Sequence, residues 1–71
     1  MRAYRTESPY YFSSKQLLPR GSVVFFSEKT KRYVHPLDGI LLDPHPRLQS
    51  LSNEESLKLE THWQEQLSRY Q

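Results

Sequence analysis

The residues with the most potential for chemistry lie in the basic segment Glu28–Arg32, which reads EKTKR. Aromatic residues flank it on both sides. Interleaved basic and aromatic side chains can bind single-stranded nucleic acid, because cations contact phosphates and rings stack on bases. The same pattern is more commonly the solvated tip of a hairpin whose rings fill the core. The nucleic-acid interpretation assigns phosphate contacts to Lys29, Lys31, Arg32 and Arg47, and base stacking to Tyr33.

Spacings typical of metal binding or catalysis do not occur in the sequence. The histidines lie ten and seventeen residues apart, the chain has no cysteine, and the two glycines are eighteen residues apart. These spacings match neither a zinc site nor a glycine-rich phosphate loop, and no serine lies in a nucleophile motif. His35 and Asp38 are close enough to share a turn, which is a more common role than metal ligation. We therefore expect no enzyme activity, metal, cofactor or small-molecule substrate.

The clearest predicted element is an amphipathic helix over residues 52–70. Ser52 and Glu55 have the spacing of a capping box, in which the serine hydroxyl accepts a hydrogen bond from the backbone N–H three residues on. At ~100° per residue, four apolar residues fall within a stripe of roughly 80°. They are Leu59, Trp63, Leu67 and Tyr70.

A β-hairpin over about residues 22–35 is predicted to form the sheet on which this helix packs. Two strands rich in β-branched and aromatic residues flank a polar turn, and Pro36 ends the second strand. Tyr10–Phe12 and Ile40–Leu42 add short strand candidates. The fold class is therefore α+β, a single small domain over residues 1–71. It contains a curved antiparallel sheet of three or four strands with the helix on one face. Residues 1–9 fit a flexible arm, and the prolines in 43–50 favour an extended connector.

The run Val23–Phe26 places apolar side chains on both faces of its strand. One helix covers one face, so the other must be covered by the N-terminal aromatic residues, by curvature of the sheet, or by another molecule. The last possibility predicts a partner-binding surface made of the uncovered face and the basic tip. Its candidate residues are Val24, Phe26, Lys29, Lys31 and Arg32.

The segment Phe25–Pro36 resembles the middle hairpin of WW domains, with paired aromatic residues, a polar turn containing threonine, and a strand that runs into proline. Leu18–Gly21 likewise resembles the LPxG opening of that family. The resemblance covers about nineteen residues. The hairpin region lacks the signature tryptophans, and the two segments are too close for the family's first strand. The chain is not assigned to the family, and no proline-rich ligand binding is implied.

Charge and hydropathy restrict the functional class further. The chain has a net charge of +2; residues 1–50 hold eight basic and four acidic residues, and 51–71 hold two basic and four acidic. So mild an asymmetry favours complementarity between the two halves over a strongly anionic partner. No apolar run approaches the ~20 residues of a membrane span, and we expect a cytoplasmic protein without membrane contact. The predicted function is that of a small regulatory or accessory protein that binds another protein or a second copy of itself. The alternative is a nucleic-acid-binding module.

Overall fold

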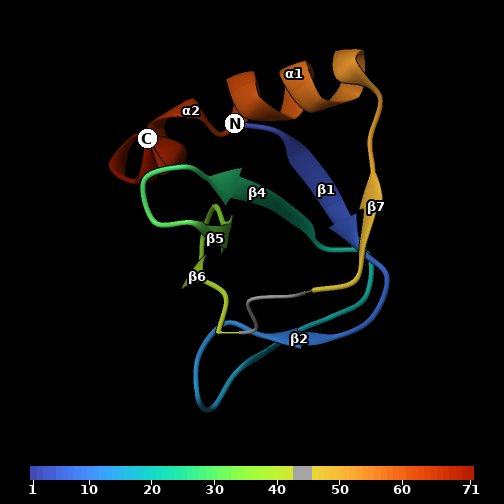
Figure 1. Ribbon diagram of the computed structural model, residues 1–71, viewed down its shortest axis with the longest axis vertical. Helices are drawn as coiled ribbons and strands as arrows, with labels where there is room; N and C mark the ends of the chain where they lie inside the picture. The colour runs from blue at the N-terminus through green and yellow to red at the C-terminus, as the bar shows by residue number, and fades with distance from the viewer. Residues whose placement is uncertain (43–45) are drawn as a thin grey trace.

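The computed structural model describes residues 1–42 and 46–71, and shows two antiparallel sheets with helices at the C-terminal end (Figure 1). The main sheet has five strands in the order β6-β5-β4-β1-β7, and the second sheet is the pair β2-β3. The strands are β1 (Ala3–Thr6), β2 (Tyr10–Tyr11), β3 (Leu17–Leu18), β4 (Val23–Ser27), β5 (Arg32–His35), β6 (Gly39–Ile40) and β7 (Leu48–Ser50). The helical segments are α1 (Asn53–His62), α2 (Gln64–Leu67) and the 3₁₀ turn η1 (Ser68–Tyr70).

The α+β class, the hairpin and the C-terminal helix on the sheet are confirmed, but the sheet has five strands instead of three or four. Both additional strands come from segments that the sequence analysis treated as irregular. Residues 3–6 form β1, which lies between β4 and β7, so the flexible arm is wrong for this stretch. Residues 48–50 form the edge strand β7 instead of continuing the connector. The part of the connector at 43–45 lies outside the described residues.

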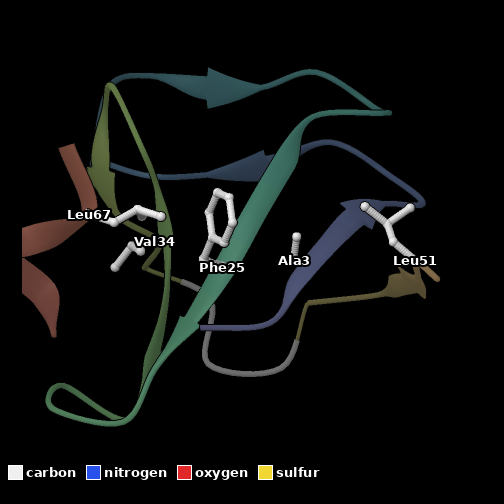
Figure 2. Close-up of a cluster of buried hydrophobic side chains, with 5 residues drawn as sticks. All are labelled: Ala3, Phe25, Val34, Leu51 and Leu67. Carbon is white, nitrogen blue, oxygen red and sulfur yellow. The ribbon is translucent and has the colours of Figure 1, made fainter. Parts of the chain in front are cut away.

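Strand register places one row of apolar side chains beneath the helices. Ala3 of β1 is opposite Phe25 of β4, Phe25 is opposite Val34 of β5, and Val34 is opposite Ile40 of β6. Directly opposite residues in antiparallel strands share a face. This row, together with Leu51 and Leu67, forms a core in which Phe25 is fully buried (Figure 2). The helical segments therefore cover this face, as the apolar stripe predicted.

The opposite face of the sheet is covered from within the chain over part of its area. Val24 packs with Leu18 of β3 and with Leu41, and Phe12 and Leu48 contact this second cluster from its margin. In Figure 1 the helices and β2 lie at opposite ends of the molecule, with the main sheet between them. The chain therefore covers this face itself, but the buried cover is Leu18 and Leu41, and the N-terminal aromatic residues Tyr4 and Phe12 only pack against this cluster while partly buried.

The helix begins as predicted but does not continue unbroken to residue 70. The Ser52 hydroxyl accepts a hydrogen bond from the backbone N–H of Glu55 at 3.2 Å. At Trp63 the backbone leaves helical geometry, with φ −103° and ψ 18°, and α2 and η1 follow. A straight helix over 52–70 would be ~28 Å long. The sheet of five strands is only ~19 Å wide, so a straight helix would extend beyond its edge. The bend brings Leu67 into the core, where it is fully buried.

A buried hydroxyl on α1 links the helix to the start of β1. Ser56 is buried, and its Oγ accepts the backbone N–H of Ala3 at 2.9 Å. Ser56→Ala leaves that buried N–H without its partner, and the expected loss in the free energy of unfolding is about 1–3 kcal/mol. Urea denaturation measures it. Ser68→Ala on the exposed η1 is the control, with an expected effect within about 0.5 kcal/mol. Equal stability of both variants would show that the Ser56–Ala3 bond contributes nothing.

Candidate interaction surface

Val24, one of the predicted partner-binding residues, is not on the surface. Its side chain is 0% exposed, and Leu18 and Leu41 pack over it. It therefore belongs to the core, and the prediction that it contacts a partner is wrong. The neighbouring Phe26 has a different environment, because it is partly exposed and belongs to neither of the two buried clusters.

An aromatic cluster, defined here as Tyr4, Phe26 and Tyr33, lies on the same face as Val24. Tyr4 is opposite Val24, whereas Phe26 and Tyr33 are opposite each other nearer the β4–β5 turn. The ring centroids of Phe26 and Tyr33 are 5.1 Å apart, and those of Tyr4 and Tyr33 are 5.9 Å apart, both with edge-to-face geometry. Such pairs stabilise each other beyond their buried area. All three rings are partly exposed. Burial raises the pKa of the Tyr33 phenol, and the nearby Tyr4 raises it further.

A hollow of about 420 Å³ opens beside this aromatic cluster. Tyr4 and Phe26 supply apolar wall, Arg2 and Lys29 supply cations, and Glu28 supplies one anion. Met1, Tyr70 and Gln71 complete the lining. The volume falls within the ~300–1,000 Å³ of ligand pockets, near the lower limit. The hollow combines apolar walls with charges of both signs.

The three basic residues of the predicted tip are exposed, and the structure brings them together at the β4–β5 turn. Lys31 Nζ lies 2.9 Å from Glu28 Oε2 in an exposed pair, and Lys31 has a left-handed backbone with φ 60°. The Arg32 guanidinium donates to the backbone carbonyl of Leu42 at 3.3 Å. An exposed ion pair contributes little stability, so Lys31 remains available to a ligand.

Arg47, the fourth predicted phosphate contact, does not join this group. It precedes β7, which is separated from β5 by β4 and β1, or ~14 Å at the usual strand spacing. Its backbone carbonyl accepts the N–H of Glu7, beyond the end of β1 that lies away from the β4–β5 turn. Arg47 is exposed but lies at a different part of the surface.

Of the eight residues that line the hollow, only Phe26 and Lys29 were predicted as site residues. Tyr4 and Arg2 fall in the segment interpreted as an arm, and both lie beside Phe26 because β1 pairs with β4. The Arg2 guanidinium donates to Asn53 Oδ1 at 2.7 Å and to the Leu51 carbonyl at 2.8 Å. The run Ala3–Thr6 reads AYRT and does not alternate apolar and polar residues, so its local signal for a strand was only the strand preference of Tyr4 and Thr6.

His35 and Asp38 meet in the β5–β6 turn, as their spacing suggested. His35 Nδ1 accepts the backbone N–H groups of Leu37 and Asp38 at 3.3 and 3.2 Å, and lies 3.2 Å from Asp38 Oδ2. Burial lowers the pKa of His35, and the Asp38 carboxylate opposes that shift. Over residues 1–42 and 46–71, no three histidine or acidic side chains are placed to hold a metal ion.

The lowered pKa of His35 predicts a stability that depends on pH. The unfolded chain binds the proton more readily than the folded one. This contribution is therefore present above the unfolded pKa of about 6.5 and is lost as pH falls through the folded pKa. Urea unfolding from about pH 8 to about pH 5 measures the loss. His35→Asn keeps an acceptor for the turn but does not titrate, so its curve is expected to be flatter. An identical pH profile for His35→Asn and the parent would contradict the prediction.

Comparisons with known proteins give no family for this chain. No protein-family model, curated protein or solved structure shows significant similarity to it. Among the described residues, no helix is long and apolar enough to cross a bilayer. The surface geometry is therefore the basis for any functional proposal.

Proposed function

We propose that the protein is a small, non-enzymatic regulatory or accessory protein of the cytoplasm that acts by binding another protein. The observation that carries this proposal is the partly exposed aromatic cluster beside a hollow of about 420 Å³. Aromatic residues in partly formed pockets are enriched among the residues that dominate binding energy at protein interfaces. Phe26 and the exposed tip residues Lys29, Lys31 and Arg32 keep the role predicted for them, and Tyr4 and Tyr33 join them.

The geometry favours a protein partner over nucleic acid. Base stacking needs an exposed ring face, whereas Tyr33 is packed edge-to-face with both Phe26 and Tyr4. Protein interfaces, in contrast, commonly combine aromatic contacts with a rim of mixed charge.

The test is affinity purification of tagged protein from the cells that produce it. Phe26→Ser and Lys29→Glu are expected to reduce recovery of a bound protein severalfold or more. Leu57→Ser is the matched control, since Leu57 is 65% exposed on α1 and does not line the hollow. Circular dichroism of each variant checks folding. Equal recovery by the parent, Phe26→Ser and Lys29→Glu would contradict the proposal.

A second copy of the chain is one form that the partner could take. If the partner is a second copy, light scattering after size exclusion gives a solution mass that rises toward that of a dimer at the higher of two protein concentrations. Phe26→Ser is expected to shift this equilibrium to the monomer, and Leu57→Ser is expected to leave it unchanged. A dimer that persists in Phe26→Ser would place the self-association elsewhere on the molecule.

The exposed cations at the β4–β5 turn support nucleic-acid binding as the second candidate. In that case fluorescence anisotropy with a labelled oligothymidine detects binding that weakens steeply as salt rises. Lys31→Glu then abolishes binding, whereas Arg47→Glu has a smaller effect because Arg47 lies away from the turn. Binding at low salt that is insensitive to Lys31→Glu would exclude this candidate.

A further inference from the structure

The basic side chains around the aromatic hollow differ in whether they already have hydrogen-bond or ion-pair partners within the protein. The Arg2 guanidinium is held by Asn53 and the Leu51 carbonyl, and Arg32 donates to Leu42. Lys31 pairs with Glu28. The Lys29 ammonium, which lines the hollow, is exposed and has no ion-pair partner within residues 1–42 and 46–71. Of Arg2 and Lys29, the two basic side chains that line the hollow, Lys29 is therefore the one that is free to meet a ligand charge.

The β4–β5 turn carries a net positive charge. Residues 28–32 contain three basic side chains and one acidic one, which gives a net charge of +2 next to the aromatic wall. The only acid among them is engaged with Lys31 at 2.9 Å. Charge complementarity at a rim selects partners and speeds their encounter. An apolar hollow with a positive rim suits an apolar anchor that has negative neighbours.

We propose, building on the protein-binding function above, that the hollow takes a peptide segment of a partner protein in which one aromatic or aliphatic side chain is flanked by aspartate or glutamate. The apolar side chain packs against Tyr4 and Phe26, and the flanking carboxylates face Lys29 and the exposed Lys31. Basic and uncharged segments lack the second contact and bind more weakly.

The experiment is selection of a random peptide library displayed on phage against the immobilised full chain. Enriched peptides are expected to carry an excess of aspartate and glutamate beside an apolar residue. The best of them is then synthesised with a fluorescent label, together with a version in which each acid is replaced by its amide. We expect the amide version to bind at least about fivefold more weakly, an effect that high salt reproduces in the parent peptide.

Variants of the protein assign the contacts. Lys29→Glu is expected to weaken the acidic peptide by about tenfold and to leave the amide peptide nearly unchanged. Because Lys29 is exposed, this substitution leaves the core unchanged, and a change in affinity reports the loss of the Lys29 charge. Phe26→Ser is expected to weaken the binding of both peptides by at least about tenfold. Leu57→Ser is expected to weaken the binding of neither peptide.

The outcomes separate the two proposals. Peptides that need Phe26 but show no acidic excess, or that bind Lys29→Glu normally, would overturn the inference and leave the protein-binding function intact. Absence of any peptide that depends on Phe26, together with salt-sensitive binding of oligothymidine, would overturn both and favour nucleic acid. Enriched peptides that carry an acidic excess and whose binding depends on Lys29 and Phe26 support both proposals.

Discussion

Phe25→Ala is expected to lower the free energy of unfolding by about 3–5 kcal/mol, as large aromatic-to-alanine changes do in a close-packed core. Phe25 is 0% exposed and occupies the centre of the row that runs from Ala3 to Val34. A domain of 71 residues has a total stability of about 4–11 kcal/mol. The variant therefore loses a large share of its stability, which urea denaturation followed by circular dichroism measures.

Phe26→Ala is the matched control for this prediction. The two residues are adjacent in β4 and lose the same atoms, but Phe26 is partly exposed and packs edge-to-face with Tyr33. Its expected cost is smaller, about 1–2 kcal/mol. Equal losses in the two variants would show that Phe26 belongs to the core, and the aromatic cluster could then not serve as a binding surface.

Val24→Asp is expected to leave most of the chain unfolded at neutral pH. Val24 is 0% exposed between the main sheet and the Leu18–Leu41 layer. The substitution removes about 1.5–3 kcal/mol of apolar burial and introduces a carboxylate with no partner, whose desolvation costs several kcal/mol more. Loss of the folded far-ultraviolet spectrum and of dispersed amide signals in a two-dimensional NMR spectrum tests this expectation.

Leu42→Asp is the control for Val24→Asp, because Leu42 is 51% exposed and an aspartate there remains in water. Its expected change in stability is within about 0.5 kcal/mol. If Val24→Asp were as stable as Leu42→Asp, the second face of the sheet would be open in solution. The original interpretation of Val24 as a partner-binding residue would then return.

The amino-acid sequence alone determined the elements that rest on local patterns. The capping pair Ser52 and Glu55 located the start of the helix, and the apolar stripe from Leu59 to Tyr70 identified the side that packs on the sheet. The polar run between two β-rich segments located the β4–β5 turn. These features depend on residues within one helical segment or one hairpin, so the information needed is present in the local sequence.

Only the tertiary structure decided which apolar residues are buried and which are available for binding. The run Val23–Phe26 showed that both faces of its strand need cover. The cover of Val24 comes from Leu18 on β3 and from Leu41, which directly follows β6. Likewise, Tyr4 reaches Tyr33 only because β1 pairs with β4 and β4 pairs with β5. Pairing between distant strands depends on the whole set of competing contacts and not on local preference. The candidate surface at the hollow is therefore a property of the assembled sheet.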